Sequence, residues 1–238
     1  MKIALLGYGR MGHMIEELVQ ASDEDQIVLK VDQDNSNQIT TAQLAEADVA
    51  IDFSTPDSAV TNIKRAIAAG LPVASGTTGW LEQWEEVTQF CRQREGAFLY
   101  ASNFSIGVNL FFAINQRLSE LMNDHPYDIT IDETHHIHKQ DAPSGTAITL
   151  AEQILKNVKR KEKWVLENAT TDKELLILAH RKDEVPGTHV VRYDSPIDSI
   201  EIKHEAHGRV GFASGALTAA RWLIGRQGIF TMQDVLGI

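Results

Sequence analysis

The chain has 238 residues, of which 43% are hydrophobic and 23% are charged, and its formal net charge is −11. These values fit one large or two closely joined globular domains, and the negative charge argues against broad nucleic-acid binding, which requires a basic face. The single cysteine excludes an internal disulfide and a cysteine metal cluster. There is no signal-peptide pattern and no apolar run of about 18 residues that could span a membrane, so we expect a soluble, cytoplasmic protein.

The first motif in the chain is a glycine-rich stretch between a short apolar strand and a helical pattern. It reads Gly7-Tyr-Gly9-Arg-Met-Gly12, which is G-x-G-x-x-G in the strand–turn–helix context of dinucleotide-binding proteins. Gly7 permits a tight turn, Gly9 lets the main chain approach a pyrophosphate, and Gly12 allows close helix–strand packing. A second strand ends at Asp32, whose carboxylate can accept hydrogen bonds from the adenosine ribose.

The choice between NADH and NADPH depends on the residues around Asp32. Its carboxylate favours NADH, because it would repel the 2′-phosphate of NADPH. Gln33 follows and provides no positive charge, although Arg10 could reach that phosphate from the glycine loop. Both cofactors therefore stay open, with a preference for NADH.

Strands and helices continue to alternate up to residue 104. We predict strands at residues 27–31, 48–53, 72–75 and 97–101, and helices at 54–69 and 81–94. Alternation with short connections predicts a parallel sheet with right-handed crossovers, and ligands of such sheets bind beyond the carboxyl ends of the strands. Phe104 follows one of these ends, where it could shield a nicotinamide ring or be a core aromatic residue.

The pattern changes after residue 109. We predict helices at 110–122, 144–158 and 215–224, and strands at 127–132, 175–179, 188–193 and 199–203. Strands without intervening helices indicate a mixed or antiparallel sheet. The predicted fold class is α/β, with a Rossmann-type parallel-sheet domain at residues 1–104, completed by 215–238, and an α+β domain with an open mixed β-sheet at 105–214.

The stretch 133–147 combines proton-transfer groups with the start of a helix. Three histidines, a lysine and two acids fall within residues 133–141, and Ala-Pro-Ser144-Gly-Thr follows. Histidine titrates near neutral pH, and lysine can donate a proton or stabilise negative charge. Ser144 can cap a helix whose first-turn N–H groups attract an anion. The stretch therefore predicts an acid/base site beside a carboxylate or phosphate site.

A metal site is the main alternative for the same stretch. His135, His136 and His138 could bind a metal together with Glu133 or Asp141, as in a metal-dependent hydrolase. If the segment is extended, however, alternation separates His135 from the other two histidines, and the spacing does not match an H-E-x-x-H helix. A hydrolase would also leave the glycine motif unexplained, so we expect no metal. A non-catalytic NAD-binding sensor is a further alternative.

Taken together, these residues resemble the dihydrodipicolinate reductase family, also named 4-hydroxy-tetrahydrodipicolinate reductases, of bacterial lysine biosynthesis. The stretch 133–147 matches the family signature nearly letter for letter. Other family segments match in the right order, namely Arg10-Met-Gly, Asp52-Phe-Ser, Gly76-Thr-Thr-Gly and Asn103-Phe-Ser-x-Gly-Val-Asn109. The resemblance covers essentially the whole chain. It implies reduction of 4-hydroxy-tetrahydrodipicolinate to tetrahydrodipicolinate by NADH or NADPH, on the diaminopimelate route to lysine.

The resemblance also implies roles for individual residues. His135 and Lys139 would be catalytic, as acid/base residue and proton donor, and His136, Gly145 and Thr146 would bind a small dicarboxylated, imine-type substrate. With Asp32, the cofactor site would comprise Gly7, Tyr8, Gly9, Arg10, Met11, Gly12, Gly76, Thr77, Thr78, Ala101, Ser102, Asn103 and Phe104. Residues 105–214 would form the substrate-binding and oligomerisation domain, through whose sheet a homotetramer assembles.

Two departures from the family pattern concern the cofactor. The glycine loop is one residue shorter than the common family form, and the acid at position 32 lacks the arginine that often follows it. Both changes lie at the adenosine end of the cofactor site. They bear on the balance between NADH and NADPH and not on the proposed chemistry.

Overall fold

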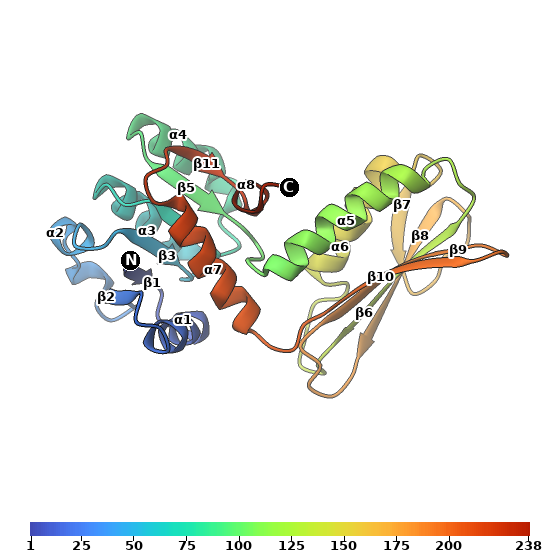
Figure 1. The fold of residues 1–238 in the computed structure, drawn as a ribbon, viewed down its shortest axis with the longest axis horizontal. Coiled ribbons are helices and arrows are strands. Elements are labelled where there is room, and N and C mark those ends of the chain that lie inside the picture. Colours follow the sequence, from blue (N-terminus) through green and yellow to red (C-terminus); the bar gives the residue numbers. More distant parts are fainter. The chain divides into compact units, whose positions relative to one another are not determined.

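The computed structural model describes residues 1–238 as two compact units (Figure 1). One unit comprises Met1–Ile106 and Val210–Ile238, and the other comprises Gly107–Arg209. The second unit is thus inserted into the first. The second boundary lies earlier than the predicted division at 214/215, because the last long helix already begins at Val210.

The first unit contains a six-stranded sheet in the order β2-β1-β3-β4-β5-β11, and all its strands are parallel. The strands are β1 (Lys2–Leu6), β2 (Gln26–Val31), β3 (Val49–Asp52), β4 (Val73–Ser75), β5 (Ala97–Tyr100) and β11 (Gly228–Phe230). The central strands are buried along nearly their whole length, as expected where helices cover both faces of a parallel sheet. The predicted Rossmann-type sheet is confirmed.

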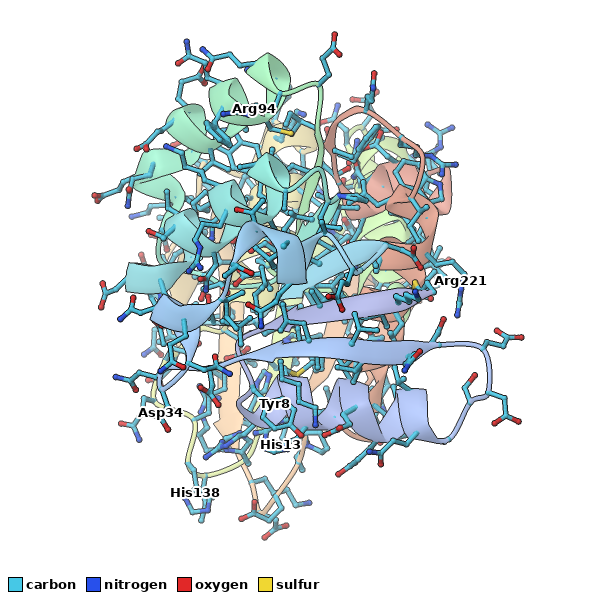
Figure 2. The ribbon with its side chains drawn as sticks, turned by 90° about the vertical axis from the view of Figure 1, so that its left-hand side faces the viewer. Tyr8, His13, Asp34, Arg94, His138 and Arg221 are labelled. Carbon is cyan, nitrogen blue, oxygen red and sulfur yellow. The ribbon has the colours of Figure 1, made fainter.

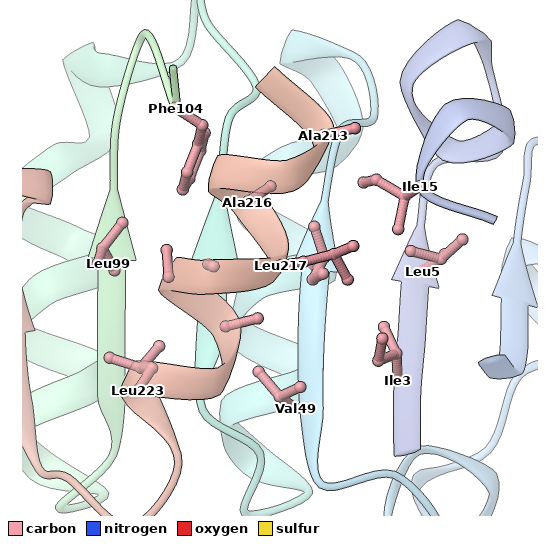
Figure 3. Packing of buried hydrophobic residues seen from close by; sticks show 14 of the residues in the cluster. Ile3, Leu5, Ile15, Val49, Leu99, Phe104, Ala213, Ala216, Leu217 and Leu223 are labelled. Atoms are coloured by element: carbon pink, nitrogen blue, oxygen red, sulfur yellow. The ribbon is translucent and has the colours of Figure 1, made fainter. Parts of the chain in front are cut away.

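Helices cover both faces of this sheet, with α1 and α7 on one face and α3 and α4 on the other (Figure 1). The helical segments are α1 (Arg10–Gln20), η1 (Ser36–Gln38), α2 (Thr41–Leu44), α3 (Pro56–Ala68), η2 (Leu81–Gln83), α4 (Trp84–Gln93), α7 (Val210–Leu223) and α8 (Met232–Leu236). Figure 3 shows α7 lying over the strands, and its residues Ala216 and Leu217 belong to the same buried cluster as Val49. Small residues let this helix lie close to the sheet.

One glycine of α7 fixes the chain that follows β5. A Cβ atom at Gly215 would lie 1.8 Å from the main-chain oxygen of Phe104, so a larger residue cannot be accommodated without a shift. The ring of Phe104 is 1% exposed and belongs to the core beneath α7. This contact holds the main chain at one of the carboxyl ends of the sheet, where a ligand is expected.

The second unit contains a five-stranded mixed sheet in the order β10-β9-β6-β8-β7. Its strands are β6 (Asp128–His135), β7 (Lys163–Leu166), β8 (Glu174–Arg181), β9 (Thr188–Asp194) and β10 (Ser199–Glu205). The central strand β6 runs antiparallel to β9 and parallel to β8. The helices α5 (Ile106–Met122) and α6 (Gly145–Asn157) lie side by side against the sheet (Figure 1), and its other face is not covered by a helix of this unit. The predicted open mixed sheet is confirmed.

Several predicted element boundaries were wrong. The helix after residue 104 begins at Ile106 and the last long helix at Val210. The strand predicted at 127–132 continues to His135, which brings the start of the histidine-rich stretch into the sheet. The short elements β7, β11, α2 and α8 were missed, because three to five residues are too few for a periodic pattern. None of the helices has both the length and the apolar character needed to cross a membrane.

Candidate active site

The glycine loop joins β1 to α1 at the carboxyl end of the first sheet. Gly7 has a φ of +97°, and a Cβ atom there would lie 2.2 Å from the main-chain oxygen of Phe53. A Cβ atom at Gly12 would lie 2.7 Å from the oxygen of Gly7, whereas a Cβ atom at Gly9 would have no neighbour within 4 Å. Gly7 and Gly12 therefore serve the packing of the loop itself. Gly9 leaves open space, as an approaching pyrophosphate would require.

The first turn of α1 is available to an anion. Gly9 is the N-cap residue, and it has no side chain to bind the first-turn N–H groups. The helix dipole adds partial positive charge at the same place, and the side chain of Arg10 is exposed beside it. The end of α1 can therefore receive the pyrophosphate of a dinucleotide.

The side chain of Tyr8 is engaged by neighbouring elements of the first unit. Its ring packs against that of His13, with centroids 4.2 Å apart, and its hydroxyl donates to Glu16 (Figure 2). The ammonium of Lys30 lies 2.5 Å from a carboxylate oxygen of Glu16 and 3.2 Å from the hydroxyl oxygen of Tyr8. Glu16 thus neutralises a lysine that lies two residues before Asp32.

Asp32 follows β2 at the same end of the sheet as the glycine loop. Its Oδ1 atom accepts hydrogen bonds from the N–H groups of Asp34, at 2.9 Å, and Asn35, at 3.0 Å. One carboxylate oxygen therefore holds the turn, and the exposed side chain can offer the other to a ribose. Asp34 is also exposed (Figure 2) and adds a second negative charge to this turn.

A buried carboxyl group lies at the end of β3. Asp52 is 0% exposed, and its oxygens accept hydrogen bonds from the hydroxyls of Ser54, Ser75 and Thr77 at 2.6, 2.7 and 2.8 Å. Burial raises the pKa of Asp52, and these hydrogen bonds only partly oppose the effect. The carboxyl group links the ends of β3 and β4 to the loop at residues 76–78.

Two residues predicted to line the cofactor have their side chains engaged elsewhere. The hydroxyl of Thr77 donates to Asp52 and accepts from the N–H of Ser54 at 2.8 Å. The ring of Phe104 packs edge-on against that of Phe53, with centroids 5.7 Å apart, so its side chain is part of the core. Thr77 and Phe104 would meet a cofactor through their main chain. The other predicted residues of these two loops are Gly76, Thr78, Ala101, Ser102 and Asn103, of which Thr78 and Ser102 are exposed.

The second unit builds a buried cluster around β6. Glu133 and His135 are two residues apart on this strand and therefore share a face, and the register with β9 places His189 opposite Glu133. The Oε2 atom of Glu133 lies 3.5 Å from Nδ1 of His135 and 3.6 Å from Nε2 of His189, and the imidazole rings are 5.0 Å apart. The hydroxyl of Ser144 is 3.1 Å from the same Nε2. Glu133 is 0%, His135 8% and His189 4% exposed, so the cluster is closed to bulk water.

Ser144 connects this cluster to the start of α6. Its N–H donates to both carboxylate oxygens of Glu133, at 3.0 and 3.1 Å. Its hydroxyl oxygen accepts a hydrogen bond from the N–H of Ala147 at 3.2 Å. Ser144 is therefore the N-cap residue of α6, as predicted. The N–H groups of Gly145 and Thr146 have no acceptor within the helix, and a Cβ atom at Gly145 would meet nothing within 4 Å. These two N–H groups could therefore receive an anion.

The surroundings of Glu133 and His135 shift the pKa of each side chain and thereby set its charge at neutral pH. Burial by itself would raise the pKa of Glu133, but hydrogen bonds with His189 and Ser144 outweigh it and hold the pKa at about 2. Burial, assisted by His189, lowers the pKa of His135 to about 4. At neutral pH Glu133 is therefore ionised and the imidazole of His135 is neutral.

The remaining histidines lie in a turn. β6 ends at His135, and the N–H of Lys139 donates to the oxygen of His136 at 3.1 Å, so residues 135–138 are not extended. The rings of His136 and His138 are 6.0 Å apart, and exposed His138 lies 3.2 Å from a carboxylate oxygen of Glu184 (Figure 2). His135 is thus separated from the other two histidines by a turn and not by the strand alternation considered from the sequence.

Arg181 anchors the loop that carries Lys139. It lies opposite His135 in the register of β6 with β8, and its guanidinium donates to the main-chain oxygens of Lys139 and Asp141, at 3.4 and 2.5 Å. The ammonium of Lys139 donates to both carboxylate oxygens of Asp141, at 2.8 and 2.7 Å. The guanidinium also lies 3.5 Å from Glu133. Lys139 is therefore held in a loop tied to the same cluster.

Glu133, His135 and His189 also offer three possible metal-ligand atoms within 4.8 Å of one another. This set differs from the three histidines that the sequence proposed as ligands. Both oxygens of Glu133 already accept from the N–H of Ser144, and the Arg181 guanidinium stands 3.5 Å away, so a cation would compete with two existing partners. The arrangement favours acid/base chemistry.

Comparison with known proteins identifies the family. The sequence model of dihydrodipicolinate reductase, N-terminus, matches residues 1–104, and that of dihydrodipicolinate reductase, C-terminus, matches residues 107–236. The chain belongs to the dihydrodipicolinate reductase family. A 4-hydroxy-tetrahydrodipicolinate reductase from Christiangramia forsetii is 50% identical over 237 residues, covering 99% of this chain and 98% of the relative. One from Methanoregula boonei is 33% identical over 252 residues, with coverage of 100% and 98%.

Solved structures of low sequence identity share the fold. A dipicolinate-bound dihydrodipicolinate reductase from Paenisporosarcina sp. TG-14 has a TM-score of 0.77 at 21% identity and covers 97% of both chains. A probable dehydrogenase from Thermotoga maritima has a TM-score of 0.58 at 9% identity, covering 99% of this chain and 92% of the other. The family is one of reductases, so neither the metal-dependent hydrolase nor the non-catalytic NAD-binding sensor is supported.

Some residues of the cluster were missed from the sequence. His189 and Arg181 were not singled out, and Glu133 was considered only as a metal ligand. Strand alternation could have placed Glu133 and His135 on one face, had β6 been extended to its full length. The register with β8 and β9, which brings in Arg181 and His189, has no signal in a single sequence.

Proposed function

We propose that this chain reduces 4-hydroxy-tetrahydrodipicolinate to tetrahydrodipicolinate with NADH or NADPH, as a step of the diaminopimelate route to lysine. Family membership supports the reaction, and the observation that carries it is the buried cluster around His135 beside the open N–H groups of Gly145 and Thr146. A dicarboxylated substrate that gains a hydride and a proton needs both an anion site and proton-transfer groups.

The two units would divide the binding tasks. In the first, the N–H groups at the start of α1 would hold the pyrophosphate and Asp32 the adenosine ribose, in agreement with the open space at Gly9. When bound, the reduced nicotinamide supplies the hydride. In the second, Gly145 and Thr146 would donate to one substrate carboxylate, with His136 as a further contact.

His135 and Lys139 would handle the proton. With a pKa of about 4, His135 is neutral at neutral pH and can take up or relay a proton. Lys139 brings an ammonium group, which is paired with Asp141, and would act as the proton donor. The loop contacts of Arg181 keep this lysine close to the cluster.

The residues at the end of β2 favour NADH over NADPH. Asp32 and Asp34 place two exposed carboxylates there, and Glu16 neutralises Lys30, which leaves Arg10 to meet a 2′-phosphate. We expect a higher kcat/KM with NADH. A strong preference for NADPH would show that Arg10 or another residue overrides the two carboxylates.

We also propose a homotetramer in the cytoplasm. The face of the mixed sheet turned away from α5 and α6 carries half-buried Leu176, Leu178 and Val190 beside polar residues, which suits assembly sheet against sheet. A monomeric mass in sedimentation equilibrium would contradict the assembly. The buried, unpaired Cys91 is compatible with a reducing compartment.

The experiment for the function is NAD(P)H oxidation coupled to the enzyme that makes the unstable substrate. His135→Ala and Lys139→Ala are expected to keep the fold and cofactor binding but to lose roughly 100-fold or more in turnover, the usual contribution of a positioned acid or base. His138→Ala is the matched control, because His138 is exposed and paired only with Glu184 on the surface; it should retain normal turnover.

Two outcomes would overturn this assignment. Wild-type turnover in both His135→Ala and Lys139→Ala would remove these residues from the chemistry. Loss of activity on chelation, restored by zinc, would point to a metal at Glu133, His135 and His189 instead.

A further inference from the structure

Glu133 has no task in the reaction outlined above, although its buried carboxylate lies among donors from several elements. These are the N–H of Ser144, the rings of His135 and His189, and the guanidinium of Arg181. We propose that Glu133 is a positioning residue, which holds His135 in its Nδ1–H tautomer and ties it to the first turn of α6. The inference rests on the acid/base role proposed for His135.

The surroundings of Nδ1 of His135 support the tautomer. This atom is buried and makes no hydrogen bond, and Oε2 of Glu133 lies 3.5 Å away. An unpartnered buried nitrogen is costly, so a small ring rotation that directs an N–H at the carboxylate is favourable. Hydrogen bonds of this kind are often long in unliganded sites and shorten when substrate binds. An ionised carboxylate can only accept, and therefore selects the Nδ1–H form.

His189 competes for the same oxygen of Glu133 but has another partner. Its Nε2 lies 3.6 Å from Oε2 of Glu133 and 3.1 Å from the hydroxyl of Ser144. The shorter contact is to Ser144, so Nε2 of His189 does not depend on the carboxylate alone. A carboxylate oxygen can accept more than one hydrogen bond, so Oε2 of Glu133 can receive the N–H of His135 as well.

No side chain of residue 187 crowds the edge of the His135 ring that carries Nε2, because this residue is a glycine. A Cβ atom at Gly187 would lie 3.1 Å from Nε2 and 3.3 Å from Cδ2 of His135. In the Nδ1–H tautomer Nε2 carries the lone pair, and it is this atom that would exchange a proton. The absence of a side chain at Gly187 gives Nε2 its clearance.

The same carboxylate links His135 to the anion site. Both oxygens of Glu133 accept from the N–H of Ser144, and Ser144 caps the helix whose next two N–H groups, of Gly145 and Thr146, are open. One buried group therefore sets the distance between the proton-transfer atom and the place where a substrate carboxylate would bind. Such groups orient catalytic residues without touching the substrate.

The tautomer of His135 can be measured directly in the folded, full-length protein. Two-bond ¹H–¹⁵N spectra of the histidine rings distinguish the two neutral forms, and the signals of His135 are assigned by their loss in His135→Gln. At neutral pH we expect the Nδ1–H form in the wild type. Glu133→Gln should convert it to a mixture or to the Nε2–H form and lower kcat roughly 10- to 100-fold, as loss of an orienting partner does. The KM for NADH should stay near the wild-type value.

A matched control separates positioning from general stability. Glu174 is another buried carboxylate of the same sheet; it accepts the N–H of Thr170 at 2.6 Å and pairs with Lys163 at 3.1 Å. Glu174→Gln makes the same chemical change away from His135, so it should leave both the His135 spectrum and kcat unchanged. Gly187→Ala should lower kcat while His135 keeps the Nδ1–H form, because the added methyl group crowds Nε2.

The proposal can fail in ways that are distinct from failure of the proposed function. An Nε2–H tautomer in the wild type would overturn it, and this needs no variant to fold. An unchanged His135 spectrum in folded Glu133→Gln would overturn it as well. Normal turnover in His135→Ala would instead refute the acid/base role, while leaving the tautomer measurement intact.

Discussion

Asp52 in the first unit and Glu133 in the second are both fully buried carboxyl groups on sheet strands, but their neighbours differ in kind. Three hydroxyls bind Asp52, and burial nevertheless raises its pKa. Around Glu133 are a main-chain N–H, two imidazoles and the guanidinium of Arg181, and its pKa falls to about 2. At Asp52 the effect of burial exceeds that of the hydrogen bonds from the hydroxyls, whereas at Glu133 the hydrogen bonds with His189 and Ser144 exceed the effect of burial. Two carboxyl groups without exposed surface thus differ in role: Asp52 links the loops at the ends of β3 and β4, and Glu133 is held ionised in the second unit.

The largest expected effect is that of removing the charged centre. Glu133→Leu leaves the N–H of Ser144 without its acceptor and Arg181 without its buried partner. We expect a loss of about 3 kcal/mol in the free energy of unfolding, at the lower end for a broken buried pair because Arg181 is partly exposed. Urea unfolding at neutral pH measures it. A loss below about 1 kcal/mol in the free energy of unfolding, the value of one ordinary hydrogen bond, would show that Glu133 is not part of a buried ion pair.

Lowering the pH should change the contributions of Glu133 and Asp52 to the free energy of unfolding in opposite directions. The folded-state pKa of Glu133, about 2, lies below its ordinary value of 4.5, so its stabilisation is present above pH 4.5 and is lost as the pH falls toward 2. The pKa of Asp52 is raised above 3.8, so its contribution is present below pH 3.8 and is lost as the pH rises through the raised value.

The direction of each change can be tested by measuring how the free energy of unfolding of variants depends on pH. The free energy of unfolding should fall less steeply than in the wild type for Glu133→Gln and more steeply for Asp52→Asn. One proton limits the difference in slope to about 1.4 kcal/mol per pH unit. Urea titrations at a series of pH values measure the slopes, and parallel curves for all three proteins would contradict the comparison.

The smallest effect is expected for Asp52→Asn at neutral pH. An amide has nearly the shape of a carboxyl group, and the hydroxyls of Ser54, Ser75 and Thr77 can reorient to meet it. We expect a cost of about 1 kcal/mol, close to one net hydrogen bond. Thermal and urea unfolding check this value. A cost as large as that of Glu133→Leu would mean that the three hydroxyls do not adapt to the amide and that the two sites are equally sensitive to loss of the carboxyl group.

The parts that were predictable from the sequence are those whose residues are close together in it. The Gly7–Gly12 loop and the Ser144 cap depend on neighbouring residues, and alternating strands and helices up to residue 104 determine a parallel sheet. The mixed sheet followed from strands without intervening helices, although β7 was too short to be recognised.

The parts that were missed depend on tertiary pairing. His189 and Arg181 reach Glu133 only because β9 and β8 pair with β6 in a particular register. The hydroxyl of Thr77 donates to the buried carboxyl group of Asp52 on the neighbouring strand, a contact that no local pattern in the sequence predicts. Phe104 turns into the core because α7 closes over it, and that helix comes more than a hundred residues later in the chain.

The division of the first unit into two chain segments has a consequence for its synthesis. β5 obtains its outer partner only when β11, at Gly228–Phe230, has left the ribosome, and α7 also comes late. The inserted residues 107–209 contain every strand of their own sheet and can complete it first. During that interval the nascent Rossmann sheet has an unpaired edge and an uncovered apolar face, the two features that invite aggregation. The segment Val210–Ile238 therefore completes the first unit only after the inserted residues have been made.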